Sequence, residues 1–328
     1  MIKVIVAITT YNLEEYIAQA LDSILMQKTS FDFKIRIADD CSTDKTIDIL
    51  KDYQKRYPEI VEVLFADKNM GSLANSNRLF DHIDCEYFSF LDGDDYWIGE
   101  DRLQKQVDFL DNHPEYTMCA GNTQFLVNNE LGKMMIEDRQ LNRSYDSHNY
   151  ADSSIPFIHT SSILVRNVIF INGIPDYYKK AVGTFEESAL RGEDFRRLLH
   201  LQHGPIFVMD SLFSVYRIHE RGMWQGSTKL KRIIENAIQT NFYYKYFGDA
   251  FDGIFAKQSR DTYKYMMLYL LSNNLITTKN QITEKECELF TDLLRDISSR
   301  LEEKMSYKNP VKWKMNLLKV LSDILHII

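Results

Sequence analysis

The first hundred residues alternate between short apolar runs and amphipathic segments, and no other feature constrains the fold of this chain as strongly. Val4–Ile8 is a continuous apolar run, which is typical of a strand buried on both faces. Leu13–Met26 places its apolar residues at helical spacing. The alternation continues, with strands expected over 34–38, 61–65 and 87–91 and helices over 46–57 and 73–83. This order predicts an α/β fold with a doubly wound, mainly parallel sheet.

Polar clusters follow three of the predicted strands. They are Thr9-Thr10-Tyr11-Asn12, Asp39-Asp40 and Asp92-Gly93-Asp94-Asp95. In open α/β sheets, ligands bind beyond the carboxyl ends of the strands. We therefore expect the three clusters to meet at one edge of the sheet and to form a ligand site there.

The cluster Asp92-Gly93-Asp94-Asp95 carries the sharpest chemical signal. Its three carboxylates lie within four residues and repel one another unless a hard divalent cation neutralises them. Mg²⁺ or Mn²⁺ binds one or two carboxylates and completes its shell with phosphate oxygens and water. A solvated acidic turn is the alternative. The strand before the cluster and Tyr96-Trp97 after it favour the metal site.

Composition excludes several other classes of protein. With 45% hydrophobic and 26% charged residues, the 328-residue chain is typical of a globular protein. Its net charge of -8 argues against a general nucleic-acid binder. The four cysteines form no CxxC pair, so a reducing cytoplasm is the expected location. No stretch has the length of a transmembrane helix, and the N-terminus is interpreted as a first strand and not as a signal peptide.

Beyond residue 101 the pattern is mixed, and beyond residue 229 it is helical. Helices are expected over 102–112 and 193–203. Short strands are expected over 118–121, 123–127, 161–165, 206–209 and 212–218.

Five motifs stand in a fixed order along the chain: ITTYN, ADDCSTD, NxGSLANSN, LDGDDYW and GEDF. In this order they resemble the family 2 glycosyltransferases, which have the GT-A fold, over roughly residues 1–225. The resemblance implies a Rossmann-like nucleotide-sugar-binding half over 1–100 and an acceptor-binding half over 101–228. A C-terminal helical appendage over 229–328 would follow. The implied function is inverting transfer of a sugar from a nucleotide diphosphate donor, with UDP preferred, to an acceptor hydroxyl of a growing glycan.

The resemblance assigns the nucleobase to the ends of the first two strands. In the family, the aspartate after the second strand reads the base, which corresponds to Asp39. A carboxylate there accepts a hydrogen bond from a ring N–H. Thr9, Thr10 and Tyr11 would frame the same base, Tyr11 by stacking. Ordinary core packing remains the alternative for Tyr11.

The third motif departs from the family pattern at one position. Asn69, Gly71 and Asn77 fit the expected donor-binding turn. Many members have an arginine where this chain has Ser76, and the nearest arginine is Arg78. The diphosphate contact expected from that arginine is therefore open.

The metal and the diphosphate are assigned to the fourth motif and to Tyr-Arg-x-His near residue 219. The resemblance makes Asp92 and Asp94 the ribose and metal ligands, with Gly93 in the donor site. His219 would ligate the metal or bond a phosphate, and Arg217 would neutralise charge. A structural role is the alternative for His219.

The catalytic base is assigned to Glu193-Asp194, and Asp194 is preferred. The pair opens a predicted helix, whose dipole favours an ionised carboxylate, and a general base must be ionised when the acceptor arrives. Simple charge placement at a helix start is the alternative interpretation.

Residues 304–328 carry five lysines against one acid and many apolar residues. Such a segment is typical of a helix at a membrane surface, and packing within the protein or in a homodimer is the alternative. The expected setting is therefore a lipid-linked glycan acceptor at the cytoplasmic face of the plasma membrane. Two rival functions remain, a nucleotidyltransferase and an inactive nucleotide-sugar-binding module. The place of a Gly-rich phosphate loop holds TTYNLEE, and the Glu193-Asp194 pair counts against inactivity.

Overall fold

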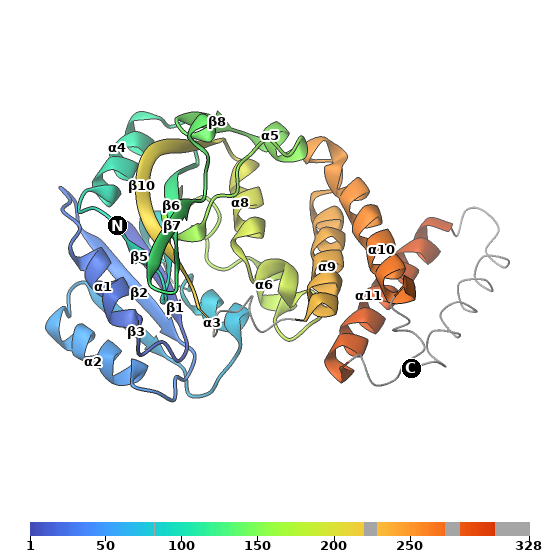
Figure 1. Ribbon diagram of the computed structural model, residues 1–328, viewed down its shortest axis with the longest axis horizontal. Helices are drawn as coiled ribbons and strands as arrows, with labels where there is room; N and C mark the ends of the chain where they lie inside the picture. The colour runs from blue at the N-terminus through green and yellow to red at the C-terminus, as the bar shows by residue number, and fades with distance from the viewer. Residues whose placement is uncertain (82, 220–227, 273–282, 306–328) are drawn as a thin grey trace. The chain divides into compact units, whose positions relative to one another are not determined.

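The computed structural model describes residues 1–81, 83–219, 228–272 and 283–305, with backbone alone at 271 and 300–305 (Figure 1). The chain divides into two compact units. Unit 1 comprises residues 1–182 and 190–225, and unit 2 comprises residues 183–189 and 226–328. Each unit is considered separately below.

Four parallel strands form the N-terminal half of the sheet in unit 1. They are β1 (Ile2–Thr10), β2 (Phe33–Asp39), β3 (Val61–Phe65) and β4 (Cys85–Asp92). Their order is β3-β2-β1-β4, so the chain winds outward in both directions from β1. Val4, Val6 and Ile8 of β1 are fully buried, as expected for a continuous apolar run between two layers. The predicted α/β fold with a mainly parallel central sheet is confirmed.

The second half of the sheet mixes strand directions. It contains β5 (Tyr96–Trp97), β6 (Met118–Val127), β7 (Glu130–Met134), β8 (Arg143–Tyr145), β9 (Leu164–Arg166) and β10 (Ile206–Ile218). The sheet continues as β4-β9-β6-β10-β5, with β6 and β10 parallel. The two runs expected over 206–218 form one strand, because register shifts around Leu212 bend it without ending it. The two runs expected over 118–127 likewise form one strand.

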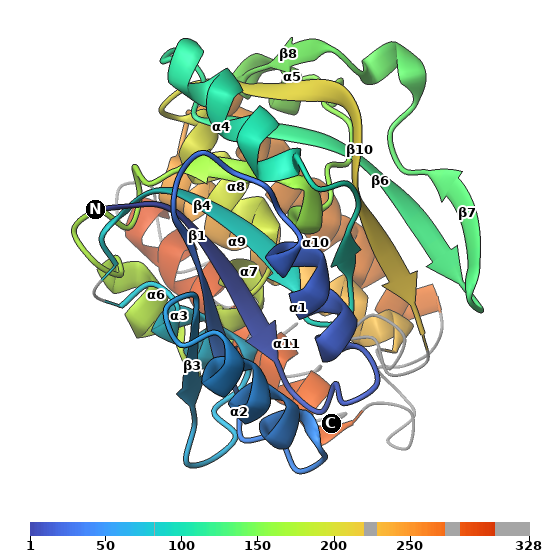
Figure 2. The same ribbon diagram turned by 90° about the vertical axis from the view of Figure 1, so that its left-hand side faces the viewer.

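One face of the sheet is covered by α1 (Ile17–Leu25), α2 (Thr46–Arg56) and α4 (Arg102–Asn112), as Figure 2 shows for α1 and α2. Helix α1 buries Ile17, Leu21 and Ile24, which recur at helical spacing, against the strands. It begins four residues later than its apolar pattern suggests. The chain first makes a loop at the end of β1, and that loop borders the polar edge.

The opposite face carries α3 (Ser72–Arg78), α6 (Asp176–Ala181) and α8 (Glu193–Leu201). A cluster of aromatic rings fills this layer, and Phe80 stacks on Phe170 with centroids 3.9 Å apart. Phe88 and Phe90 of β4 join the cluster. Helix α3 ends at Arg78, five residues before the expected end. Shorter elements are η1 (Asp138–Gln140), α5 (Ser147–Ala151), η2 (Thr160–Ser162) and α7 (Glu187–Leu190).

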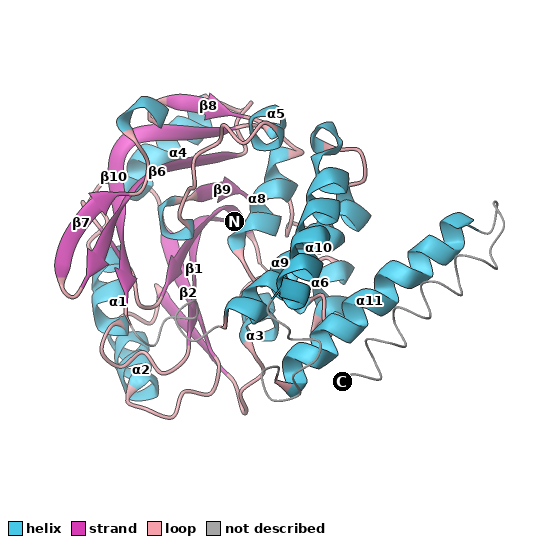
Figure 3. Ribbon diagram, turned by 45° about the vertical axis from the view of Figure 1, so that its right-hand side comes forward, coloured by secondary structure: helices cyan, strands magenta, loops and turns pink. Residues whose placement is uncertain are grey.

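Unit 2 is helical in its described part, which confirms the predicted helical C-terminal region (Figure 3). Its elements are α9 (Lys229–Phe247), η3 (Phe251–Gly253), α10 (Ile254–Ser272) and α11 (Glu284–Met305). Ile234, Met266 and Leu293 belong to its buried core. None of the helices described is both long and apolar enough to cross a bilayer. The basic segment predicted over 304–328 lies outside the residues whose side chains are described.

Candidate active site

The three polar clusters lie at the carboxyl edge of the parallel strands. In the β1–β2 ladder Thr10 is opposite Asp39, and in the β1–β4 ladder Thr9 is opposite Asp92. Three segments that are far apart in sequence therefore end at the same level. This is the arrangement expected from the strand order, because parallel strands present their carboxyl ends together.

The loop after β1 is fixed to the loop after β2 by hydrogen bonds. The Asn12 side chain accepts from the backbone N–H of Thr43 at 2.7 Å, and the Asn12 N–H donates to Ser42 Oγ at 2.9 Å. Asn12 has a φ of 53°, a backbone conformation that asparagine tolerates better than most residues. Tyr11, one residue before, remains 46% exposed. Its ring is therefore free to pack against a planar ligand.

The two aspartates after β2 have different surroundings. The Asp39 carboxylate is fully buried and accepts hydrogen bonds from the N–H and Oγ of Ser42 at 3.0 and 2.5 Å. The Asp40 carboxylate accepts from the N–H groups of Met70 and Gly71 at 2.7 and 3.0 Å. Asp39 thus organises its own loop, and Asp40 holds the turn before α3. Sequence reasoning did not single out Asp40, although successive residues of a strand point to opposite faces.

The turn before α3 depends on Gly71. Its φ of 86° lies in the region that favours glycine, and its N–H also approaches the exposed Asn69 Oδ1 at 3.2 Å. Asn77, predicted in the donor site, is instead buried and donates to the carbonyl of Tyr178 in α6 at 3.3 Å.

Arg78 does not extend its guanidinium toward a ligand. Its Nη2 donates to the carbonyl of Phe65 at 2.7 Å, and its Nη1 donates to the carbonyl of Asp39 at 3.2 Å. These bonds tie α3 to the ends of β2 and β3. Arg78 therefore does not replace the arginine that the family pattern has at the position of Ser76.

The acidic turn after β4 concentrates negative charge. Burial, together with the charges of Asp94 and Glu193, raises the pKa of Asp92 to about 7. Asp94 faces His219, with Oδ2 and Nε2 3.0 Å apart. A Cβ at Gly93 would lie 2.9 Å from Leu13 Cδ1 and 3.3 Å from the carbonyl of Thr9, so a side chain here would require Leu13 to shift.

Arg217, at the end of β10, braces this turn. Its Nε donates to the carbonyl of Asp94 at 3.0 Å, and its Nη2 donates to Gln19 Oε1 at 2.7 Å. The guanidinium also lies over the ring of Tyr16, 4.7 Å from its centroid. Arg217 therefore fixes the backbone of the acidic turn and contributes positive charge beside it.

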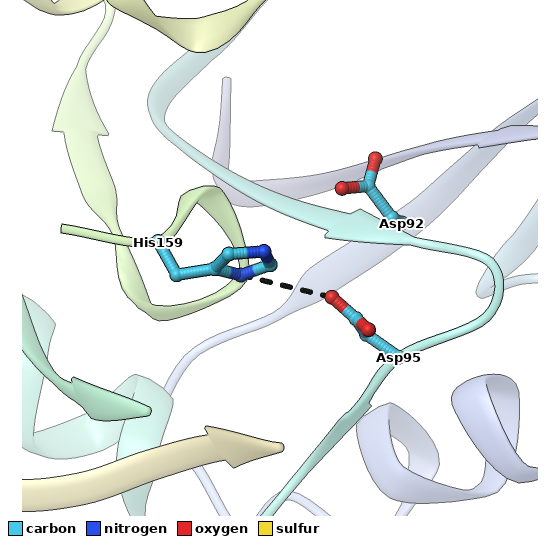
Figure 4. A group of neighbouring side chains, drawn as sticks. All are labelled: Asp92, Asp95 and His159. Atoms are coloured by element: carbon cyan, nitrogen blue, oxygen red, sulfur yellow. Dashed lines mark ion pairs between the residues drawn. The ribbon is translucent and has the colours of Figure 1, made fainter. Parts of the chain in front are cut away.

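Asp95 and His159 form a buried group that the sequence did not reveal (Figure 4). Asp95 accepts hydrogen bonds from Ser161 Oγ at 2.6 Å and from the Arg217 N–H at 3.0 Å. Asp92, Asp95 and His159 each bring one ligand atom within 4.8 Å of the other two. No local motif signals His159, because its contacts are with residues far away in the chain.

The residues of this turn fit a divalent cation. Burial, and after it the charges of Asp94 and Glu193, raises the pKa of Asp92, and a cation beside it would favour its ionised form. Carboxylate oxygens are the ligands that Mg²⁺ and Mn²⁺ prefer, and imidazole suits several divalent transition metals. The buried Nδ1 of His219 finds no hydrogen-bond partner in the part of the chain that the structure describes. Asp94 and His219 thus have ligand atoms suited to Mn²⁺ or Mg²⁺, and the group of described residues whose ligand atoms lie within 4.8 Å of one another is Asp92, Asp95 and His159.

Helix α8 begins with the two acidic residues expected as candidate bases. Asp194 pairs with Arg197 one turn later, whereas the charge of Glu193 acts on Asp92. Burial raises the pKa of Asp194, and Arg197 acts in the opposite direction. The two acids thus differ in their surroundings, with Glu193 in electrostatic contact with the acidic turn and Asp194 held by an arginine.

The comparisons with known proteins agree with this fold. The sequence model described as Glycosyl transferase family 2 matches residues 5–172, which is just over half of the chain. The fold defines an α/β domain with a mainly parallel central sheet, and the chain belongs to glycosyl transferase family 2.

Curated relatives resemble this chain over part of their length. An uncharacterized protein, Rv1520 of Mycobacterium tuberculosis, is 32% identical over 227 residues, covering 66% of this chain and 59% of that protein. The chain thus spans about three fifths of the length of this relative. The putative teichuronic acid biosynthesis glycosyltransferase TuaG of Bacillus subtilis is 37% identical over 101 residues, covering 31% of this chain and 39% of TuaG.

Solved structures share the fold. Residues 1–349 of Staphylococcus aureus TarS in complex with UDP match with a TM-score of 0.55 and 18% identity, over 99% of this chain and 88% of that one. The mannosyltransferase PcManGT of Pyrobaculum calidifontis, in complex with GDP-Man and Mn²⁺, matches with a TM-score of 0.51 and 13% identity, over 99% and 86%. At such identities the likeness concerns the fold.

Proposed function

We propose that this protein is an inverting glycosyltransferase that moves a sugar from a UDP-sugar to a hydroxyl of a growing glycan. The observation that carries the proposal is the acidic turn after β4, where Asp94 lies 3.0 Å from His219 beside the aligned ends of β1 and β4. This turn lies at the carboxyl edge of the sheet, where α/β folds bind ligands, and the charge of Glu193 at the start of α8 acts on its Asp92.

The donor would bind along the carboxyl ends of β1, β2 and β4. Tyr11 offers an exposed ring for stacking on the base. Thr9, Thr10 and Asp39 surround the same place in the ladders. Because Ser42 encloses the Asp39 carboxylate, a base N–H would reach Asp39 after Ser42 shifts, and Asp40 is the neighbouring acceptor.

The diphosphate would lie near the acidic turn. Asn69 and Gly71 supply the turn before α3, Gly93 lets the acidic turn approach β1, and Arg217 contributes positive charge. Asp92, Asp94 and His219 would hold Mn²⁺ or Mg²⁺. When bound, the cation would stabilise the charge that develops on the leaving diphosphate.

The reaction would be a single displacement. Asp194 removes the proton from the acceptor hydroxyl, whose oxygen attacks the anomeric carbon while the nucleoside diphosphate leaves from the opposite face. The configuration inverts because one bond forms as the other breaks. Arg197 favours the ionised form of Asp194, which is the form that accepts a proton. Glu193 is the second candidate for this role.

The acceptor is proposed from the relatives. TuaG carries the name of a putative teichuronic acid biosynthesis glycosyltransferase, and this supports a surface glycan as the acceptor class. A lipid-linked glycan at the cytoplasmic face of the membrane fits the basic segment over 304–328.

A thermal-shift screen with Mn²⁺ tests the donor class, because a ligand that binds the folded state raises the melting temperature. UDP and UDP-sugars are expected to raise it more than GDP and GDP-sugars. Calorimetry with UDP and GDP then ranks the two bases. Tighter binding of GDP would overturn the choice of UDP. Release of pyrophosphate from a nucleoside triphosphate and a sugar phosphate would instead identify a nucleotidyltransferase.

A further inference from the structure

His159 lies just before η2 and has no role in the mechanism proposed above. Its imidazole is only 7% exposed and packs on the ring of Tyr216, with centroids 4.5 Å apart. Figure 4 shows the ring pointing toward Asp92 and Asp95, with one edge facing each carboxylate. A histidine held this firmly beside the acidic turn has a fixed orientation, so its hydrogen-bonding capacity can be worked out.

The contacts of Nδ1 decide where the ring carries its proton. Nδ1 lies 3.3 Å from the backbone N–H of Ser161, and a backbone N–H can only donate. The Asp95 Oδ2 atom is 3.7 Å away, beyond hydrogen-bonding distance. Nδ1 therefore accepts. Because Nδ1 accepts from the Ser161 N–H, the single proton of the neutral ring is on Nε2.

Two complementary groups next to each other lack partners. Nε2 of His159 has no hydrogen-bond partner among residues 1–81, 83–219, 228–272 and 283–305, and neither does the Asp92 carboxylate. One is a donor and the other is an acceptor. Asp95 differs from both, because Ser161 and Arg217 already donate to its two oxygens.

We propose that Asp92 and His159 together bind one hydroxyl group of the nucleotide-sugar donor. The hydroxyl donates to the Asp92 carboxylate and accepts from the Nε2–H of His159. This inference rests on the proposed function. A hydroxyl is the group that both donates and accepts, and it therefore satisfies both side chains at once.

The spacing agrees with this assignment. Two hydrogen bonds of about 2.8 Å to one tetrahedral oxygen separate the two protein atoms by about 4.6 Å. A carboxylate oxygen of Asp92 and one ring nitrogen of His159 lie within 4.8 Å of each other, so one oxygen atom can bridge the two side chains. Metal ligation by Nε2 would require its lone pair and would move the proton to Nδ1, where it would face the N–H of Ser161. The geometry therefore favours a hydroxyl over a cation at Nε2.

The experiment compares three substitutions of His159 by calorimetry with UDP and with UDP-GlcNAc, in the presence of Mn²⁺. His159→Phe keeps a ring against Tyr216 and loses the N–H. His159→Asn has an amide too short to reach the place of Nε2, whereas His159→Gln brings an amide N–H close to it. We expect the Phe and Asn variants to bind UDP-GlcNAc about tenfold more weakly, which is the usual effect of losing one hydrogen bond. The Gln variant should retain most of the affinity. Equal weakening toward UDP assigns the hydroxyl to the ribose, and weakening toward UDP-GlcNAc alone assigns it to the sugar.

Two controls distinguish the loss of a hydroxyl contact from damage to the fold or to the metal site. Thermal unfolding checks that the variants fold. If the Phe variant does not fold, the comparison of the Asn and Gln variants is sufficient to test the inference. The affinity for Mn²⁺ alone, measured by electron paramagnetic resonance, should not change. A loss of Mn²⁺ affinity would overturn this inference and leave the proposed function standing. Unchanged nucleotide affinity in the Phe and Asn variants would do the same. Wild-type protein that binds neither nucleotide overturns the proposed donor and this inference with it.

Discussion

Asp94 is the carboxylate of the acidic turn that faces His219, and its side chain is 23% exposed. Substitution by alanine removes a candidate metal ligand without opening a cavity in the core. We expect Asp94→Ala to lose metal-dependent sugar transfer and to keep its melting temperature in chelator. Calorimetry with Mn²⁺ measures the binding directly. A variant that transfers sugar at the parental rate without divalent metal would show that the metal assignment is wrong.

Glu193 and Asp194 are adjacent acids with different neighbours, so substitution of each should affect sugar transfer and ligand binding differently. Asp194→Asn is expected to keep donor affinity and to lower transfer by about 10²–10⁴-fold, the usual contribution of a general base. Glu193→Gln removes a charge that acts on Asp92, and a change in donor or metal binding is expected from it. Transfer rates and donor affinities of both variants are the measurement. If Glu193→Gln is the inactive variant and Asp194→Asn transfers normally, the two roles are exchanged.

Arg197 should control the pH at which the base works. It is buried and pairs with Asp194, and its charge lowers the pKa of that carboxyl while burial and Glu193 raise it. Removing the positive charge therefore raises the pKa of Asp194, and the ionised base is then present only at higher pH. We expect the acid limb of the kcat/KM profile of Arg197→Met to shift upward, with less change at alkaline pH. Tyr150 also faces this carboxyl and titrates far above the range concerned.

That experiment includes a control for a merely structural role. An effect on packing alone would lower activity at every pH and leave the limb where it is. Arg197→Lys keeps the charge and should restore the position of the limb, though not the planar geometry of the pair.

At the scale of elements, β10 packs against β6 at Gly121, a position of β6 that has no room for a side chain. A Cβ at Gly121 of β6 would lie 2.3 Å from Phe213 Cδ2 and 2.5 Å from the carbonyl of Ser211. Because part of the clash is with backbone, we expect Gly121→Ala to destabilise the protein by about 1–3 kcal/mol. Gly132→Ala is the matched control, since its nearest neighbours are 3.6 Å away. Urea unfolding of both variants measures the difference, and equal midpoints would contradict the prediction.

The N-terminal elements could be predicted because each has a local pattern. The apolar run of β1 and the helical spacing in α1 are readable without knowledge of their partners. The polar residues Asp210 and Ser211 interrupt the apolar pattern of β10, so one bent strand was interpreted as two. Helix α3 was predicted too long, because the apolar residues after Arg78 belong to the aromatic layer and not to the helix.

The site was predictable to the extent that strand ends mark it. Asp92 and Asp94 follow a strand, and the sheet rule locates them without further information. The roles of Asn77 and Arg78 depend on side-chain direction, which a motif does not contain. His159 depends on contacts between distant segments and was missed for that reason.

At the scale of the whole molecule, the charge distribution is uneven. Residues 304–328 carry five lysines on a chain of net charge -8. If they lie at an anionic bilayer, each lysine adds up to about 1 kcal/mol of attraction, which salt screens. We expect the full chain to sediment with anionic liposomes at low salt, and a chain ending at Glu303 to remain in solution. Neutral liposomes are the control. Equal sedimentation of both chains would refute membrane binding, and a truncation that turns a dimer into a monomer would favour packing between subunits.

The residues that contact the acidic turn are synthesised much later than the turn itself. Asp94 meets His219, and Asp95 meets Ser161 and the Arg217 N–H. During synthesis, the four-stranded N-terminal sheet can pair its strands before any of these residues has left the exit tunnel. For that interval the chain would have three mutually repelling carboxylates and no counterpart for them. The acidic turn would therefore gain these contacts only at the end of unit 1 synthesis, after the strands of the N-terminal sheet have paired.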